Sequence, residues 1–128
     1  MDDSERLAAA RAMRRRVLGD AYVDSVTAET DPVAQEFQDY ITRTAWGVWA
    51  RGGPLSTRDR SLLVLAITAA LGRMEEFELH VRAAPNAGVS DAEIDELLFQ
   101  LVAYAGGPAG VGTRRIIRRV RAERQQEP

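Results

Sequence analysis

The segment 61–71 is apolar around almost the whole circumference of a helix. Leucine, valine, isoleucine and alanine fill it, and only Ser61 and Thr68 interrupt them. A helix without a polar face has to be covered by other parts of a protein. Its eleven residues are too few to cross a bilayer, which takes about 20. The segment therefore predicts a central helix that is buried inside a domain.

The rest of the sequence also follows helical spacing. It contains no sustained alternation of apolar and polar residues, whereas alanine, leucine, glutamate and arginine recur at intervals of three and four. We therefore expect an all-α domain of about six or seven helices and no β-sheet. Besides 61–71, the expected helices cover residues 4–18, 32–49, 73–84, 90–105 and a last, arginine-rich segment around 114–124.

Capping residues and helix breakers separate these segments. Four side chains stand where an N-cap is expected: Ser4, Asp31, Ser56 and Ser90. Pro32 favours a first helical turn after Asp31, and Glu93 completes a capping box with Ser90. Glycine and proline should end helices at Gly19, 51–54, Gly72, a turn at 85–88, and 106–108.

Length and composition limit the protein class. A chain of 128 residues is enough for one compact domain. We expect that domain to span 1–128, with an N-terminal helical extension at 1–30 and a frayed tail at 122–128. No apolar run approaches the length of a membrane span, and the first residues lack the pattern of a signal peptide. These features favour a cytoplasmic protein.

The charged and reactive residues exclude several chemistries. There is no cysteine, which rules out disulfides, thiolate metal sites and cysteine nucleophiles. A single histidine makes a zinc site improbable, so we expect no metal. All seventeen basic residues are arginine, but nineteen acidic residues leave a formal net charge of -2. Without excess positive charge or a DNA-binding motif, neither nucleic acid nor a membrane is an expected partner.

The only histidine lies four residues after a glutamate. On a helix over 73–84, Phe77 and Val81 share one face, while Glu76 and His80 form an adjacent stripe. Glu76 could accept a hydrogen bond from the imidazole and favour its protonated form, which is an acid–base arrangement. The alternative is an ordinary surface pair at i and i+4. Spacing alone leaves both interpretations open.

The order of several motifs is more specific. Together they closely resemble the 4-carboxymuconolactone decarboxylase family over roughly residues 35–109. The resemblance rests on Trp46-Gly47-Val48-Trp49-Ala50-Arg51, on the segments 55–63 and 70–83, on Gly88-Val89-Ser90 with Glu93-Ile94, and on Leu97-Leu98-Phe99-Gln100 with Tyr104-Ala105-Gly106-Gly107-Pro108-Ala109.

This resemblance implies a cofactor-free lyase of the β-ketoadipate (protocatechuate) pathway. It also implies an alkylhydroperoxidase-D-like helical fold, usually assembled as a ring-shaped homohexamer. Related proteins carry a Cys-x-x-Cys-x-x-x-His motif, whose cysteines correspond to Arg73 and Glu76 and whose histidine corresponds to His80. Dithiol peroxidase chemistry is excluded here, because neither Arg73 nor Glu76 can form a disulfide.

The implied reaction assigns roles to individual residues. Loss of carbon dioxide from 4-carboxymuconolactone sends electrons into a conjugated lactone, so no external electron sink or cofactor is needed. His80 would then protonate a ring carbon as general acid, with Glu76 as its orienting partner. Arginine suits carboxylate binding through paired contacts, and the candidates are Arg51, Arg58, Arg60 and Arg73. Solvated helix ends or subunit salt bridges are the alternative role of these arginines.

The sequence also departs from the pattern of the family. The segment Arg51-Gly52-Gly53-Pro54-Leu55 is one residue longer than the usual Arg-Pro-Gly-Leu, and 110–115 lacks the usual apolar continuation. A divergent paralogue acting as lyase or isomerase on another lactone or enolisable acid, in a biosynthetic pathway for example, therefore stays open. A non-catalytic helical oligomeric binding protein is the second alternative.

The apolar surface predicts self-association. A helix of the buried type, together with Trp46 and Trp49 on one helix face, leaves more apolar surface than one small domain readily covers. We therefore expect a homo-oligomer. The family resemblance implies a hexamer or a trimer, and a small-molecule lactone carboxylate as the other partner. The two tryptophans are expected in the core or in a subunit interface.

Overall fold

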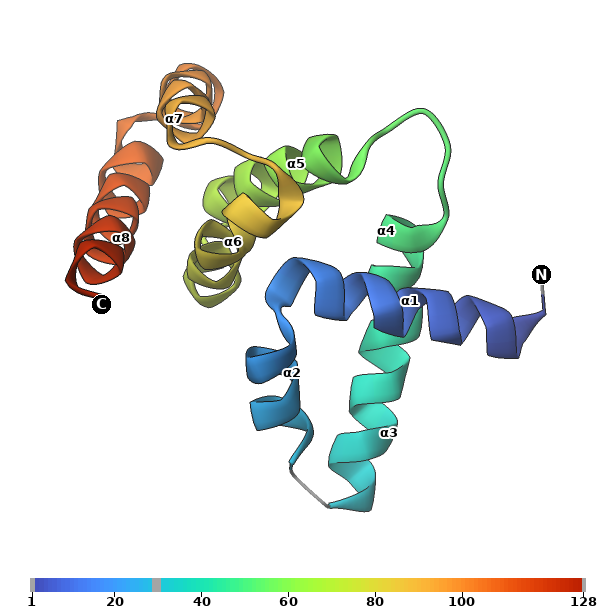
Figure 1. Cartoon of the computed structure of the whole chain (residues 1–128). Helices are drawn as coiled ribbons and strands as arrows, with labels where there is room; N and C mark the ends of the chain where they lie inside the picture. Colours follow the sequence, from blue (N-terminus) through green and yellow to red (C-terminus); the bar gives the residue numbers. More distant parts are fainter. Residues whose placement is uncertain (1, 29–30, 128) are drawn as a thin grey trace. The chain divides into compact units, whose positions relative to one another are not determined.

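The computed structural model describes residues 2–28 and 31–127. In these residues it contains eight α-helices and one π-helical turn, and no β-strand, as the helical spacing predicted. The chain divides into two compact units, 1–57 and 58–128 (Figure 1). The expectation of a single domain over 1–128 stays a prediction.

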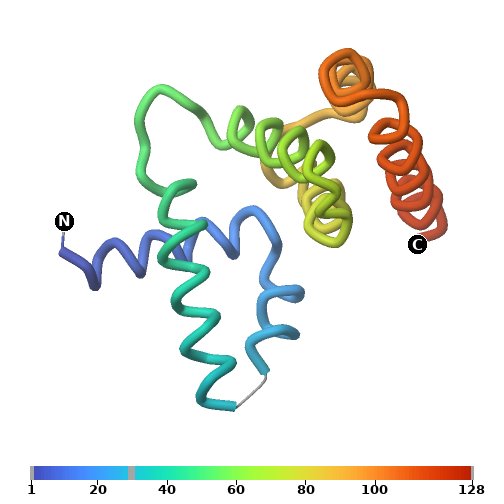
Figure 2. Tube along the Cα trace, turned by 180° about the vertical axis from the view of Figure 1, so that it is seen from behind, coloured from blue at the N-terminus to red at the C-terminus, as the bar shows by residue number. Residues whose placement is uncertain are grey.

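Unit 1 contains the first four helices and the π-helical turn. They are α1 (Asp3–Leu18), α2 (Asp20–Thr27), α3 (Pro32–Ile41), η1 (Thr42–Trp46) and α4 (Gly47–Ala50). The elements α3, η1 and α4 form one continuous helical path, and α1 lies across it against η1 and α4 (Figures 1 and 2). The side chains buried there are mainly Ala10, Val17, Val23, Thr42, Trp46 and Trp49.

The ends of α1 differ in part from the prediction. Asp2, not Ser4, is the N-cap: its carboxylate accepts from the backbone N–H of Glu5 at 2.8 Å, and Glu5 accepts from the N–H of Asp2. Ser4 is thus already inside the helix, because Asp2 with Glu5 supplies both halves of a capping box. Gly19 ends α1 as predicted, with a φ of 89°.

Gly19 also begins the short helix α2, which the sequence analysis did not predict. The backbone N–H of Val23 donates to the carbonyl of Gly19 at 3.1 Å, so the same residue closes one helix and opens the next. Buried Val23 is the contact of α2 with the core of unit 1. In eight residues, one buried side chain leaves almost no periodic signal.

The helix expected at 32–49 is present but not uniform. Asp31 caps it through the N–H of Val33 at 3.0 Å, and Pro32 stands in its first turn. The five residues of η1 then widen the helix to a π turn, a local feature frequent at functional sites. Trp46 and Trp49 are both buried, with ring centroids 4.9 Å apart, which agrees with their expected place in the core.

Unit 2 contains most of α5 (Thr57–Leu71) and the whole of α6 (Met74–Ala87), α7 (Asp91–Ala105) and α8 (Gly107–Gln126). Helix α8 packs against both α6 and α7. The hydrophobic core of unit 2 contains residues from all four helices and from the loop before α7. They are Leu65, Ala69, Phe77, Val81, Ala84, Val89, Ile94, Leu101, Ile117 and Val120.

Helix α5 corrects the expectation of a helix buried on every side. Leu65 and Ala69 are buried, but Leu63, Ile67 and Leu71 are 46%, 54% and 64% exposed in the chain. These three residues recur every four positions and form an apolar stripe on the outside of α5. The expectation was wrong because the helices of this small unit supply a core on one side of α5 only.

The turn expected at 85–88 is also a correction. Helix α6 continues through Pro85 to Ala87 and ends only at Gly88, which has a φ of 86°. The N–H of Val89 donates back to the carbonyl of Ala84 at 3.0 Å, so the last carbonyls are satisfied despite the proline. Burial of Ala84, Ala87 and Val89 offsets the hydrogen bond that Pro85 cannot make.

The connection between the last two helices is shorter than the predicted segment 106–108. Gly106, with a φ of 95°, is the only residue between α7 and α8, and Gly107 and Pro108 already belong to the first turn of α8. Helix α8 continues to Gln126, into the segment for which we expect a frayed tail. Fraying itself stays a prediction.

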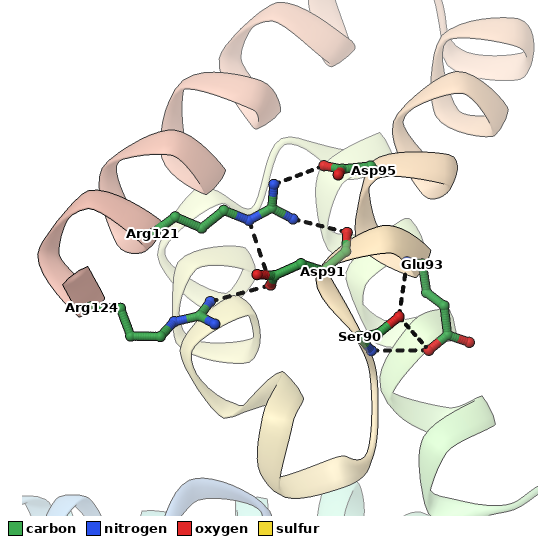
Figure 3. A network of polar contacts seen from close by, with 6 residues as sticks. All are labelled: Ser90, Asp91, Glu93, Asp95, Arg121 and Arg124. Carbon is green, nitrogen blue, oxygen red and sulfur yellow. Dashed lines mark hydrogen bonds and ion pairs between the residues drawn. The ribbon is translucent and has the colours of Figure 1, made fainter.

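A polar network joins the start of α7 to the end of α8 (Figure 3). The capping box of Ser90 and Glu93 is confirmed, with both of its hydrogen bonds between 2.9 and 3.2 Å. Arg121 donates to a carboxylate oxygen of Asp95 at 2.8 Å and to the backbone carbonyl of Asp91 at 2.9 Å. Arg124 lies 3.5 Å from the Asp91 carboxylate.

Close packing of α7 and α8 depends on Gly110. A Cβ at this position would lie 2.4 Å from the Cγ2 atom of Val102, whereas one at Gly112 would meet nothing within 4 Å. We expect Gly110→Ala to destabilise the protein by about 1–3 kcal/mol, as overpacking does. Gly112→Ala in the same helix should stabilise it by about 0.5–1 kcal/mol. Urea unfolding measures both, and equal effects of the two variants would contradict this packing.

Candidate active site

His80 lies in the middle of α6 and is only 8% exposed. Glu75 and Glu76 in the first turn of α6 favour the helix through its dipole, and the buried face of Phe77, Val81 and Ala84 attaches it to the core. The Nδ1 atom of His80 is inaccessible to solvent. The sequence placed this residue at the edge of the buried face, and the structure places it inside the protein.

Burial determines the charge of His80. It lowers the pKa of the imidazole from 6.5 to about 4, because the charged ring loses solvation, while the nearby charge of Glu76 acts in the opposite direction. The sequence left the net direction open, since burial and a neighbouring carboxylate oppose each other. In the folded chain burial prevails, so His80 is neutral at pH 7.

Three of the four predicted arginines lie in unit 2 with His80, and their environments differ. Arg58 is ion-paired with Glu93 and lies 3.4 Å from the carboxylate of Asp59. Arg60 is buried at 8% exposure. Arg73 is exposed immediately before α6, and its carbonyl accepts from the N–H of Phe77 at 2.9 Å.

Arg51, the fourth arginine, belongs to unit 1. It lines a cavity of about 610 Å³ together with Arg6 and Arg43, two residues that the sequence analysis did not select. A signal for Arg43 was available, because Arg43, Gly47 and Arg51 follow one another at intervals of four on one helical path. Arg6 comes from α1, and only the packing of α1 on this path brings it near.

Other cavities lie within each unit of the described chain. A second, smaller one in unit 1 has about 170 Å³. In unit 2, a groove of about 610 Å³ is lined by five arginines of α8, and an apolar groove of about 590 Å³ lies between α7 and α8. His80 lines none of these four cavities.

The structure describes residues 2–28 and 31–127 of the chain. Among these residues, no three histidine, aspartate or glutamate side chains are grouped so that they could hold a metal ion. No helix in this part of the chain is both long and apolar enough to span a membrane.

Comparison with known proteins identifies the family. The model of the carboxymuconolactone decarboxylase family matches residues 35–118. The chain belongs to the carboxymuconolactone decarboxylase family. A 4-carboxymuconolactone decarboxylase from Acinetobacter baylyi is 40% identical over 110 residues, which is 85% of this chain and 81% of that protein. The resemblance seen in the sequence motifs is confirmed.

Two further proteins are similar to this chain. A nitrosuccinic acid decarboxylase from Metarhizium robertsii is 38% identical over 98 residues, 76% of this chain and 68% of that protein. A 4-carboxymuconolactone decarboxylase sequence from Pseudomonas putida is 45% identical over 47 residues, which is 37% of this chain and 98% of that sequence. The family match includes Glu76, His80 and Arg51, whereas Arg6 lies outside it.

The departures from the family pattern have defined places in the structure. Gly52 and Gly53 both have positive φ values, 78° and 92°, and form the connection between α4 and α5. An L side chain rarely adopts this conformation, which explains why the altered connection uses glycine. The other departure, 110–115, is a regular part of α8 and contains Gly110.

Proposed function

We propose that the protein is a cofactor-free carboxy-lyase that converts 4-carboxymuconolactone to β-ketoadipate enol-lactone, as in aromatic catabolism. The observation that carries this proposal is the 40% identity to a 4-carboxymuconolactone decarboxylase over 85% of the chain. Membership of the carboxymuconolactone decarboxylase family supports it independently of that one relative.

The chemistry needs no group beyond ordinary side chains. When the carbon–carboxylate bond breaks, its electron pair enters the conjugated lactone as a dienolate, and a proton is then added at a ring carbon. The protein has to bind the carboxylates, stabilise the charge that develops on the lactone, and deliver that proton. Histidine and arginine side chains can perform all three tasks.

In this proposal His80 delivers the proton. Its pKa of about 4 in the free chain reflects burial, and two substrate carboxylates nearby would raise the pKa in the complex. His80 would then bind its proton together with the substrate, and Glu76 would help to hold the charged ring. Arg58, Arg60 and Arg73, which belong to unit 2 with His80, are proposed to bind substrate carboxylates. Arg51, the fourth candidate from the sequence, belongs to unit 1. Arg58 would have to exchange its ion pair with Glu93 for a substrate carboxylate.

A second substrate class has its own support. The relative named nitrosuccinic acid decarboxylase is 38% identical over 98 residues. Nitrosuccinate also has two carboxylates, and its nitro group can accept the electrons that carbon dioxide leaves behind. A family member with the altered segments 52–54 and 110–115 could therefore act on a different enolisable acid by the same steps.

Substrate preference distinguishes these two acids. We expect kcat/KM for 4-carboxymuconolactone to exceed that for nitrosuccinate by at least tenfold, which corresponds to a difference of about 1.4 kcal/mol in transition-state binding. Both rates are measured as carbon dioxide release with the same protein preparation. A higher kcat/KM for nitrosuccinate would identify the nitro acid as the substrate. Turnover of neither acid would favour a divergent paralogue acting on another lactone or enolisable acid, or the helical binding protein.

We further propose that the protein assembles as a homo-oligomer, a hexamer or a trimer. The support is its exposed apolar surface, which includes the stripe on α5 and, from α7 and α8, Phe99 and Val111. Sedimentation at micromolar concentration tests this, and a monomer would contradict it. A cytoplasmic location, expected from the sequence, stays a prediction.

A further inference from the structure

The cavity in unit 1 combines positive charge with apolar walls. Three arginines line it, Arg6 from α1, Arg43 from η1 and Arg51 from the end of α4. The remaining lining residues are Asp3, Ala9, Thr44, Gly47, Val48 and Ala50. A volume of about 610 Å³ can hold a small organic molecule rather than only an ion.

The charges of this lining are not balanced. Asp3 is its single acidic residue, and its carboxylate lies 3.6 Å from the Nε atom of Arg43. Within residues 2–28 and 31–127, neither Arg6 nor Arg51 forms an ion pair. Three arginines against one aspartate leave two positive charges, which matches a ligand with two negative charges.

The apolar part of the lining restricts the ligand further. Ala9, Val48 and Ala50 contribute methyl groups to the lining, and Thr44 adds one hydroxyl. A bare inorganic anion would gain nothing from these walls, whereas a short carbon chain with a carboxylate at each end would contact both the walls and the arginines.

We propose that the cavity of unit 1 binds a small dicarboxylate through Arg6 and Arg51, with Arg43 held by Asp3. This ligand is a dicarboxylate separate from the proposed substrate, because His80, the proposed proton donor, lines neither cavity of unit 1. The existence of the site does not depend on the proposed function.

The chain contains an internal probe for this site. Trp46 and Trp49 are its only tryptophans. Each is next in the sequence to residues that line the cavity, namely Gly47, Val48 and Ala50. Titration of the purified protein with succinate at constant ionic strength should therefore change the tryptophan fluorescence in a saturable way. The neutral analogue succinamide should cause no such change.

Substitutions locate the binding. Arg6→Gln and Arg51→Gln should each weaken succinate binding about tenfold or more, because each removes a charged hydrogen bond. Gly47→Leu should weaken it by filling the cavity, since a Cβ at this helical position meets nothing within 4 Å and requires no positive φ. Arg16→Gln is the matched control: Arg16 is exposed on α1 and does not line the cavity.

The outcomes separate the site from the reaction. Binding that depends on Arg6 and Arg51 but not on Arg16 supports the site. Non-competitive inhibition of lactone turnover by succinate, or no inhibition, then supports a separate ligand. Competitive inhibition that disappears in Arg6→Gln would overturn the proposal, because it would identify the cavity as the substrate site. Absence of saturable binding, or equal weakening by Arg16→Gln, overturns the proposal. A protein without lactone turnover can still bind succinate, so failure of the proposed function gives a different result.

Discussion

Replacing His80 by glutamine should lower the turnover of 4-carboxymuconolactone by about 100- to 10,000-fold, the usual contribution of a general acid. Glutamine retains hydrogen-bonding capacity but cannot transfer a proton. His80 is on α6 but outside the main hydrophobic cluster, so the variant should stay folded and keep its assembly. Steady-state rates, circular dichroism and sedimentation measured on one preparation check all three statements.

The pH dependence of the rate assigns the proton more specifically. If His80 is the donor, kcat should fall as pH rises through its pKa in the complex. Glu76→Gln should move that alkaline limb to lower pH, because the charge of Glu76 raises the pKa of His80. Glu75→Gln, which removes a carboxylate from the same exposed turn, is the control. An unchanged alkaline limb in the residual activity of His80→Gln would show that another group supplies the proton.

The buried imidazole should also make the protein sensitive to acid. The pKa of His80 is about 4 in the folded chain and near 6.5 in an unfolded one, so between these values the unfolded state binds more protons. Stability is therefore complete above pH 6.5 and is lost as the pH falls towards 4. For His80 alone, the loss between pH 7 and pH 4.5 should be about 2 kcal/mol.

His80→Gln isolates this contribution from the carboxylates, which also titrate in acid. The variant should lose about 2 kcal/mol less than the wild type between pH 7 and pH 4.5, because glutamine has no charge to gain. Urea unfolding at the two pH values and at one protein concentration gives the difference. Equal losses in both proteins would mean that His80 is not held neutral by burial.

Local signals predicted most helix ends correctly. Gly19, Asp31 with Pro32, and Ser90 with Glu93 act through hydrogen bonds and dihedral angles within a few residues, and a sequence displays these directly. The end of α6 that Pro85 predicted was wrong, because contacts distant in the sequence decide where this helix ends. The local cost of Pro85 is offset by tertiary burial of Ala84 and Ala87, which the sequence does not reveal.

The geometry around His80 could be predicted in part, and the roles of His80 and Glu76 stay predictions. Helical spacing placed His80 at the edge of the buried face of α6, because this position follows from one helix, whereas the structure buries His80 inside the protein. Predicting the direction of the pKa shift of His80 requires knowing how deeply the imidazole is buried. That depends on which elements α6 packs against. The cavity of Arg6, Arg43 and Arg51 was missed because it joins residues from α1 and from η1 and α4, far apart in the sequence.

The exposed apolar stripe on α5 also shows what a sequence cannot predict about packing. Composition predicted that 61–71 must be covered, and in the chain Leu63, Ile67 and Leu71 are not. A sequence shows that a helix is apolar but does not show which of its neighbours belong to the same chain. The proposed homo-oligomer would supply the cover that unit 2 does not.

Release of carbon dioxide from 4-carboxymuconolactone tests the proposed function most directly. The purified protein is incubated with the lactone and a metal chelator, without added cofactor, and carbon dioxide and remaining lactone are measured together. We predict one carbon dioxide for each lactone consumed, at a rate that His80→Gln reduces at least about 100-fold. A folded wild-type protein that releases no carbon dioxide above the uncatalysed rate would contradict the proposal.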